Sequence, residues 1–352
     1  MLIIGCDFHP RFQQIAYLDQ ESGEYGERRL NHPEEAARFY RSVSERVVRV
    51  GVEATGSFRW FRRLLASLGQ EMILGDPSAI HASIARKQQT DKRDARHILK
   101  LLLEDRFPSV WQPPAENEET RQLLRHRCRL VRIRTKVVNQ LDGMAKNEGL
   151  LGPQGWSEKR RGQIEALYLV GWEAKRRKDL LALVDELNER IGPLDAAVRK
   201  AAAANRDACR LMTHPGVGPI VSLAYVSFIG DWQRFPRGKQ VGSYLGLIPE
   251  EASSSNKRRL GKITKQGNEL LRWLLVEAAT TAQRYDPSWH RQYMRLSMTK
   301  HHGVAKVAIA HKLAVRLYWM LRSGADYEQV RERGSHAGQS ACPSGRTMRP
   351  IG

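Results

Sequence analysis

Residues 2–31 read LIIGCDFHPRFQQIAYLDQESGEYGERRLN, and this stretch decides the fold of the N-terminal part of the chain. The run at 2–8 is apolar, the segment at 12–19 alternates loosely, and a third extended piece follows the turn ESGEYG at 24–31. Short apolar or alternating runs that are separated by turn residues predict strands. We therefore expect three antiparallel strands at the start of the chain.

The following segments alternate between helix and strand. Helices are predicted at 33–44 and 57–69, and each is followed by an apolar strand, RVVRVGVEA (46–54) and QEMILGD (70–76). A further helix begins after Thr90. A strand meander followed by βαβ crossovers implies a mixed sheet with helices on its faces. This βββαβαβ order is that of the ribonuclease H-like fold, the scaffold of many nucleases, resolvases and transposases.

Four acidic residues fall at matching places on these elements. Asp7 and Glu53 lie toward the carboxyl ends of the first and fourth strands, where an open sheet places its functional groups. Asp91 and Asp94 project from one face of the helix after Thr90. Four converging carboxylates repel one another unless cations share the site, and Mg²⁺ is held in proteins by a few carboxylates plus substrate phosphate. Two such ions about 4 Å apart could activate a nucleophile and stabilise a leaving oxygen.

Each acid also has a purely structural interpretation. Thr90 is a good N-cap, and acids in a first helical turn interact favourably with the helix dipole, which would account for Asp91 and Asp94. Asp7 alone could be a strand-end turn residue, and Glu53 alone an exposed acid. The metal-site hypothesis rests on finding all four acids on the elements that this fold brings together.

Three short motifs carry a family resemblance. GCDFHP (5–10), GVEATGSF (51–58) and QQTDKRDARHIL (88–99) resemble the successive motifs of the RuvC-like DEDD domain of the insertion-sequence "one-ten" transposase family. The resemblance implies a DNA transposase or site-specific recombinase that depends on Mg²⁺. The residues that take the places of the metal-binding D, E, D and D are Asp7, Glu53, Asp91 and Asp94.

The charge of the chain favours a polyanionic partner. The 352 residues include 58 Lys and Arg against 38 Asp and Glu, a formal net charge of +20. Such a balance is typical of nucleic-acid-binding proteins, although a merely well-solvated basic surface would also produce it. The four cysteines form no CxxC pair, so neither a zinc site nor a disulfide framework is predicted. We find no signal peptide and no membrane span, and expect a cytoplasmic protein.

Two long helices are predicted in the middle of the chain, at 116–147 and 178–201, with apolar residues spaced by three and four. The first carries seven basic residues and no acid between positions 121 and 136. Backbone phosphates are natural counterions for such a helix, and a solvated face that only mediates dimerisation is the alternative. The predicted phosphate-binding residues are Arg121, Arg125, Arg129, Arg132 and Lys136.

A third part begins near residue 208. Gly216 and Gly218 lie between apolar helical segments and resemble the turn of a helix-hairpin-helix, in which backbone N–H groups approach a phosphate. An ordinary interhelical turn explains the same residues.

The stretch GLIPEEASSSNKRRLGKITKQGN (246–268) contains a serine cluster beside basic residues. A serine in such surroundings could attack a phosphodiester, because the cations stabilise the alkoxide and the developing phosphorane charge. A flexible polar loop is the alternative interpretation. The basic residues that we expect to bind nucleic acid here are Lys257, Arg258, Arg259, Lys262 and Lys265.

The same stretch is similar to the C-terminal motif of the family, in which the nucleophilic serine follows a proline by five residues. Counting from Pro249 gives Ser254, with Ser253 as the main rival and Ser255 as a weaker one. The sequence departs from the family pattern because Ser255 replaces a common glycine, and Glu250 and its neighbour Glu251 replace residues that are often basic.

The whole chain is therefore predicted to combine an α/β part with an all-α part. The predicted domains are a RuvC-like DEDD domain (1–110), a helical coiled-coil region (115–203), a mainly helical C-terminal transposase domain (208–330) and a disordered tail (331–352). The resemblance also implies a bridge RNA that pairs with target and donor DNA, and we expect a homo-oligomer, either dimer or tetramer. The alternatives are a RuvC-like junction-resolving nuclease in which water attacks, and a noncatalytic nucleic-acid-binding remnant of a transposase.

Overall fold

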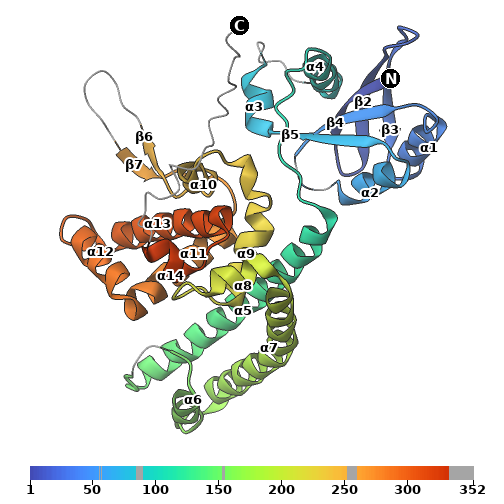
Figure 1. Ribbon diagram of the computed structural model, residues 1–352. Helices are drawn as coiled ribbons and strands as arrows, with labels where there is room; N and C mark the ends of the chain where they lie inside the picture. Colours follow the sequence, from blue (N-terminus) through green and yellow to red (C-terminus); the bar gives the residue numbers. More distant parts are fainter. Residues whose placement is uncertain (55, 57, 85–89, 153–154, 252–259, 333–352) are drawn as a thin grey trace, which may run out of the picture. The chain divides into compact units, whose positions relative to one another are not determined.

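The chain divides into two compact units, Met1–Gln112 and a second unit that starts at Pro113. The computed structural model describes residues 1–54, 56, 58–84, 90–152, 155–251 and 260–332 (Figure 1). The first unit holds a five-stranded mixed sheet, and the second is mainly helical, so the predicted sequence of a mixed sheet followed by helices is confirmed. The finer predicted domain boundaries stay predictions, and most of the predicted disordered tail lies outside the described residues.

The strands of the first unit pair in the order β3-β2-β1-β4-β5. In chain order, its described elements are β1 (Leu2–Phe8), β2 (Phe12–Asp19), β3 (Tyr25–Asn31), α1 (Glu34–Ser42), β4 (Val48–Glu53), α2 (Arg59–Ser67), β5 (Glu71–Gly75), α3 (Pro77–Ala82) and α4 (Asp91–Leu103). β1, β2 and β3 pair antiparallel, whereas β4 pairs parallel with β1 and with β5. The predicted βββαβαβ order is confirmed. The short helix α3 was not predicted. Its start is nevertheless typical of a helix, because Asp76 is a common N-cap residue and Pro77 a common first helical residue.

The alternation of β1 assigns its residues to two different faces of the sheet. Leu2, Ile4 and Cys6 are buried in the larger core, which α1 and α2 cover. Ile3 points to the opposite face and packs with Ala95 and Leu99 of α4 in a smaller core. Figure 1 shows α4 on the other side of the sheet from α1 and α2. Side chains in a strand alternate between faces, so the remaining odd-numbered residues of β1 also face α4.

The second unit consists of a helical arm and a helical bundle. Its described elements are α5 (Ala115–Asn147), α6 (Glu158–Glu165), α7 (Gly171–Ala204), α8 (Arg206–Met212), α9 (Pro219–Ile229), a 3₁₀ turn η1 (Trp232–Arg234), α10 (Gly238–Tyr244), β6 (Pro249–Glu251), β7 (Leu260–Ile263), α11 (Glu269–Tyr285), α12 (Pro287–Ser297), α13 (His302–Ser323) and α14 (Tyr327–Glu332). None of the described helices combines the length and the apolar composition that a membrane span requires.

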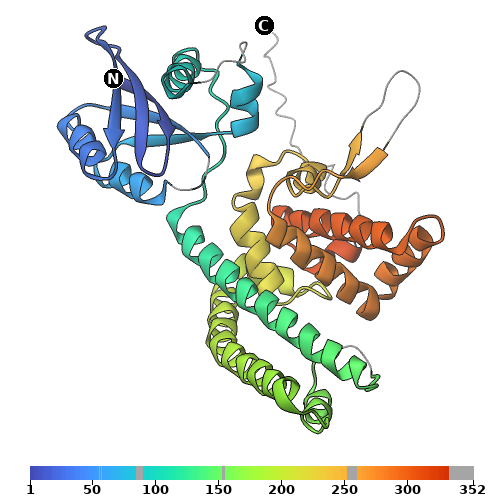
Figure 2. The same ribbon diagram turned by 180° about the vertical axis from the view of Figure 1, so that it is seen from behind.

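The two predicted long helices are confirmed as α5 and α7, which lie side by side in both views (Figures 1 and 2). Their contact buries Val137, Leu141, Val184 and Leu187. α7 begins at Gly171, several residues earlier than predicted. A separate core lies between α9, α11 and α13, and it is the largest apolar cluster among the described residues. Burial of these apolar faces is what stabilises the arm and the bundle.

Candidate functional site

A pair of glycines brings α4 close to the sheet of the first unit. Gly5 of β1 and Gly51 of β4 are direct neighbours in the parallel pairing. A Cβ added at Gly5 would overlap the backbone carbonyl oxygen of Ala95 and the amide nitrogen of Leu99 in α4. A Cβ added at Gly51 would lie 2.7 Å from the Leu102 side chain of the same helix. We call Gly5 and Gly51 the glycine seat, because α4 rests directly on them.

The two strand acids follow the glycine seat on the same face. Asp7 lies two residues after Gly5, and Glu53 lies two residues after Gly51, so the period of two points both carboxylates toward the α4 side. Both acids stand at or near the carboxyl end of their strand. In an open α/β sheet this edge is where functional groups gather.

The helix acids reach the same edge because they begin the apolar face of α4. Asp91 and Asp94 lie in the first turn, and Ala95 and Leu99 of the same helix are buried against the sheet. Thr90 is the N-cap, and its side chain accepts a hydrogen bond from the Arg93 amide. The predicted cap is therefore present, and a capping role for this first turn is compatible with a metal-binding role for its acids.

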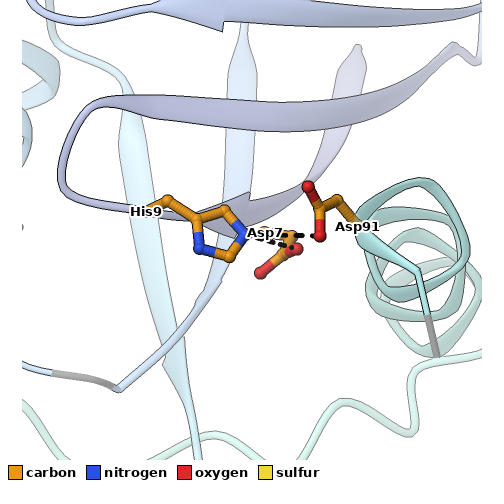
Figure 3. A group of neighbouring side chains, drawn as sticks. All are labelled: Asp7, His9 and Asp91. Carbon is orange, nitrogen blue, oxygen red and sulfur yellow. Dashed lines mark hydrogen bonds and ion pairs between the residues drawn. The ribbon is translucent and has the colours of Figure 1, made fainter.

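An aspartate from the sheet, an aspartate from α4 and a histidine form the centre of the site (Figure 3). Nε2 of His9 lies 3.1 Å from Oδ2 of Asp7 and 3.7 Å from Oδ1 of Asp91. One ligand atom from each of the three residues lies within 4.8 Å of the others. The two carboxylates are close enough to share one cation, and the imidazole lies beside both.

Asp94 and Glu53 belong to the same neighbourhood but are less tightly placed. The charge of Asp94 acts on Asp7, and the charge of His81 acts on Asp94. Nε2 of His81, in α3, lies 4.0 Å from Oε1 of Glu53. The structure thus places Asp7 and Asp91 on either side of one histidine. Asp94 interacts electrostatically with Asp7, and Glu53 lies near His81, which in turn interacts with Asp94.

The electrostatics of the cluster favour a bound cation. Burial raises the pKa of Asp7, and the charges of Asp91 and Asp94 raise it further, while His9 lowers it. Burial also raises the pKa of Asp94, and Asp91 adds to that increase, whereas His81 opposes it. Carboxylate oxygens are the donors that Mg²⁺ and Mn²⁺ prefer, so the donor set fits a hard divalent cation.

His9 and His81 were not predicted as members of the site. His9 could have been found from the sequence, because the strand period places it on the same face as Asp7 two residues earlier. His81 gives no such signal, since it lies in α3, which was itself not predicted.

The predicted serines lie between two short strands. β6 and β7 pair antiparallel, with Pro249 opposite Ile263. Ser253, Ser254 and Ser255, together with Lys257, Arg258 and Arg259, lie outside the described residues. Lys262 and Lys265 are described and exposed.

The base of this hairpin is fixed by close backbone packing. A Cβ added at Gly267 would overlap the carbonyl oxygen of Tyr244, and one added at Gly246 would overlap the backbone of Gln266. Gly246 and Gly267 both have positive φ angles, 64° and 76°. The end of α10 and the start of the segment after β7 therefore hold the hairpin at its base.

The basic face of α5 divides into structural and exposed residues. Arg121 is buried and donates hydrogen bonds to the carbonyl oxygens of Ser227 and Phe228 at the end of α9. These contacts give Arg121 a role in packing, and its predicted contact with phosphate stays a prediction. Arg132 pairs with Glu269 at 2.9 Å.

The remaining predicted cations of α5 are available at the surface. Arg129 and Lys136 are exposed, and Arg125 is partly buried with its guanidinium over the Phe228 ring. Arg125, Arg129, Arg132 and Lys136 follow one another at helical spacings of four, three and four, so they share one side of α5.

Gly216 and Gly218 have different surroundings in the turn between α8 and α9. Gly216 has a φ of 82°, and a Cβ there would lie 2.5 Å from the Ala282 amide nitrogen in α11. Its role is close packing. Gly218 is the N-cap of α9, and no atom lies within 4 Å of the position that a Cβ would take. Of the two glycines, Gly218 leaves room for a close approach from outside.

Comparisons with known proteins match both units. A DEDD transposase family model matches residues 4–147, and the model described as "Transposase IS116/IS110/IS902 family" matches residues 208–295. The chain is 28% identical to the transposase for insertion sequence element IS1111A of Coxiella burnetii over 289 residues, which cover 80% of this chain and 78% of the relative.

Two further relatives extend the comparison. A probable family 20 transposase of Pseudomonas aeruginosa is 28% identical over 336 residues, covering 91% of this chain and 96% of the relative. The pilin gene-inverting protein of Moraxella bovis is 25% identical over 301 residues, covering 79% and 81%.

Proposed function

Because this chain belongs to the IS116/IS110/IS902 family of insertion-sequence transposases, we propose that it cuts and rejoins DNA with a carboxylate metal centre and a serine nucleophile. The observation that carries the proposal is the approach of Asp7 and Asp91, from a strand and a helix distant in sequence, to one histidine at the carboxyl edge of the sheet. An inactive remnant has no need to hold like charges together at this cost.

In the proposed metal centre, Asp7, Glu53, Asp91 and Asp94 bind divalent cations, with Mg²⁺ as the expected ion. When bound, the ion would stabilise negative charge on a phosphate and on a leaving oxygen. Asp7 is fixed by the sheet and Asp91 by the cap of α4, so their carboxylates hold their positions before DNA arrives. His9 lies beside both carboxylates, with Nε2 3.1 Å from Oδ2 of Asp7 and 3.7 Å from Oδ1 of Asp91, and it lowers the pKa of Asp7, which burial raises.

In the proposed serine step, the hydroxyl of Ser254 loses its proton and its oxygen forms a bond to a DNA phosphorus. One bond between that phosphorus and a deoxyribose oxygen breaks, the leaving oxygen takes up a proton to become a free hydroxyl, and the phosphodiester is conserved as a protein–DNA ester. Attack by the hydroxyl of a second DNA end reverses these changes and rejoins the strands. Cations that follow the serines in the sequence, Lys262 and Lys265 among them, would stabilise the phosphorane charge.

Guidance by a bridge RNA and assembly as a homo-oligomer are also part of the proposal. RNA guidance rests on the family resemblance and on the net charge of +20. The relative named for inverting a pilin gene supports recombination, in which strands are both cut and rejoined.

The metal centre is tested by strand exchange between element-end DNA and target DNA, with the adjacent noncoding RNA supplied and Mg²⁺ present. Asp91→Asn removes one charged ligand, and we expect exchange to fall by a factor of about 100 or more. Glu45→Gln is the matched control, because Glu45 is an exposed acid of the same unit away from the cluster. Equal activity of the two variants would refute the metal centre.

The serine is tested by denaturing gels with labelled DNA. We expect a covalent protein–DNA adduct that disappears in Ser254→Ala, and peptide mapping should locate the ester at residue 254. An adduct at residue 253 or 255 would correct the assignment. Active cleavage without an adduct would favour attack by water and the junction-resolving nuclease. DNA binding without any cleavage, with RNA and metal present, would favour the noncatalytic remnant.

A further inference from the structure

The two helices before α14, α12 and α13, lie in a long segment without acidic residues. No Asp or Glu occurs from Pro287 to Ala325, whereas Lys and Arg occur seven times and His four times. At the average density of acids in this chain, about four would be expected in a segment of this length. A second acid-free segment runs from Trp232 to Pro249 and contains α10.

These two segments meet in the folded bundle. A Cβ added at Gly242 of α10 would overlap the imidazole of His311 in α13, so the His311 ring lies directly on α10. Nζ of Lys312, the next residue of α13, donates a hydrogen bond of 2.9 Å to Oε1 of Gln292 in α12. α10, α13 and α12 therefore form one continuous surface through His311 and Lys312.

Exposed cations on α10 and α12 flank this surface. Lys239 on α10 is exposed, and its charge acts on His311. Arg295 on α12 is exposed, and its charge acts on Lys312. Arg291 lies one helical turn before Arg295 on the same side of α12. The basic track, as we call this surface, consists of Lys239, His311, Lys312, Arg295 and Arg291.

Burial and neighbouring positive charge both act on the central residues of the basic track. Burial lowers the pKa of Lys312, and the charge of Arg295 lowers it further. Burial likewise lowers the pKa of His311, and both Lys239 and Lys312 add to the effect. An anionic partner would remove this repulsion, as phosphates do when they replace the counterions of a basic surface.

The basic track ends at the serine hairpin. α10, which carries Lys239, is the helix whose last residue, Tyr244, packs against Gly267 at the base of the hairpin. The surface is made of cationic groups on helices. Among the most exposed aromatic residues, Tyr168 and Trp172 belong to the helical arm, and Tyr285 ends α11 in a pocket that Arg291 also lines. Cationic groups bind backbone phosphates, and their spread over three helices fits the regularly spaced phosphates of a duplex.

We propose that the basic track binds the phosphate backbone of duplex DNA and leads that duplex to the β6–β7 hairpin. The inference rests on the proposed function in one respect, namely that the substrate of the hairpin is DNA. It adds a surface on α10, α12 and α13, distinct from the basic face of α5.

The test compares two triple variants of the full chain. Lys239→Gln, Arg295→Gln and Lys312→Gln remove three charges from the basic track. Lys178→Gln, Arg199→Gln and Lys200→Gln remove three exposed charges from α7 and serve as the control. The measurement is the dissociation constant of a labelled 30-bp duplex by fluorescence anisotropy, from about 50 to 200 mM salt.

We expect the track variant to bind duplex DNA at least about tenfold more weakly at the lower salt and to lower the salt slope by about 2 to 3. The control should change the slope by less than about 1. Equal weakening of both variants would overturn the proposal in favour of net charge alone. Loss of binding to an RNA duplex of the same sequence, or to an acidic peptide, with DNA binding unchanged would overturn the choice of partner.

Two further measurements keep the result unambiguous. The single variants Lys239→Gln and Arg295→Gln change exposed side chains only, so each should give a smaller loss in the same direction even if the triple variant melts at a lower temperature. Glu45→Gln, an exposed acid of the first unit outside the metal centre, should bind the duplex normally. If wild-type protein binds DNA through the track but shows neither cleavage nor adduct, the proposed chemistry fails while the track stands.

Discussion

The two units sort charge in opposite ways. The first gathers carboxylates from β1, β4 and α4 at one edge of its sheet. The second keeps acids out of the segment from Pro287 to Ala325 and lines a surface with cations instead. Like charges held together destabilise a fold, so neither arrangement is explained by stability. Each becomes favourable when its counterion arrives, a divalent cation in the first unit and a phosphate backbone in the second.

The two charged regions also differ in how rigidly they are built. In the first unit, backbone atoms of Ala95 and Leu99 in α4 rest on Gly5, so the position of the helix that carries Asp91 is set by direct contact with β1. In the second unit, Lys239 and Arg295 are exposed side chains on helices whose buried faces pack elsewhere. A metal site requires ligand positions fixed to a few tenths of an ångström, whereas phosphate binding tolerates flexible cations.

The largest effect that we predict comes from Gly5→Ala, which tests the close packing of α4 on the sheet of the first unit. The added methyl overlaps backbone atoms of Ala95 and Leu99, so α4 and its acids must shift. We expect strand exchange to fall by a factor of about 100 and stability to fall by about 1–3 kcal/mol. Strand-exchange rates and urea unfolding would measure the two losses.

Two glycine substitutions serve as controls for Gly5→Ala. Gly51→Ala should cost less, because its nearest neighbour is the flexible end of the Leu102 side chain. Gly143→Ala should be neutral or slightly stabilising, since Gly143 lies in a helix with open space around it. Full exchange activity in Gly5→Ala would show that α4 need not rest directly on the sheet.

The second prediction concerns His214, a buried histidine in the core of the second unit. Burial lowers the pKa of His214 to about 4, and its ring packs against Trp289 and Tyr327. A folded pKa below the unfolded value of about 6.5 means that the unfolded state binds more protons between these values. Stability is therefore full near pH 7 and is lost as the pH falls, by about 2 kcal/mol at pH 5.

His214→Phe keeps an aromatic ring in this position without a titrating group. Urea unfolding at pH 7 and pH 5 should show a smaller pH-dependent loss in the variant than in the wild type. An identical loss in both proteins would mean that another group titrates and that the pKa of His214 is not lowered in the folded protein.

The third prediction separates exposed cations of α5 from paired ones. Replacing Arg129 and Lys136 by Gln should lower the salt slope of nucleic-acid binding by about 2, because both are exposed. Arg127→Gln should leave the slope unchanged and lower stability instead, since Arg127 pairs with Asp195 at 2.8 Å in a mostly buried position. Anisotropy titrations and thermal melting give the two readouts. A changed slope in Arg127→Gln would contradict the division between packing and binding.

The smallest effect concerns His9 and the metal-free state. With His9→Gln, the carboxylates of Asp7 and Asp91 lose their neighbouring imidazole. We expect the metal-free variant to melt a few degrees lower and to gain more from added Mn²⁺ than the wild type does, by about 1 kcal/mol. Thermal shift with and without Mn²⁺ measures the difference. An equal gain in both proteins would show that His9 does not act as a counterion.

The sequence predicted the strands and the four acids because both leave a local pattern. β1 and β4 are apolar runs, and Asp7 and Glu53 are polar residues at their ends. The glycine seat leaves no such pattern, because its role depends on which face of the sheet α4 covers. That is a tertiary fact, visible only when Gly5 and Gly51 are found side by side under one helix.

Other features escaped prediction for equally physical reasons. β6 has three residues, all exposed and without apolar alternation, so no strand signal exists. Arg121 and Arg129 look alike in the sequence, although only the first is buried against the end of α9. The extra turns of α7 at Gly171–Arg177 contain few apolar residues, and their helical conformation follows from continuity with the packed part of the helix.

The alternation of β1 has a consequence for insertions and deletions. Cys6 must face the core under α1 and α2. Its neighbour Gly5 faces α4 and allows the helix to pack closely, and its other neighbour, Asp7, presents a carboxylate on the same face as Gly5. A single-residue insertion after Gly5 would turn Asp7 into the apolar core and bring Cys6 to the α4 face. A two-residue insertion would restore the faces but carry the carboxylate about 7 Å along the strand. This part of the chain can therefore accept exchanges of side chain at Ile4 or Cys6 far more readily than any change of length.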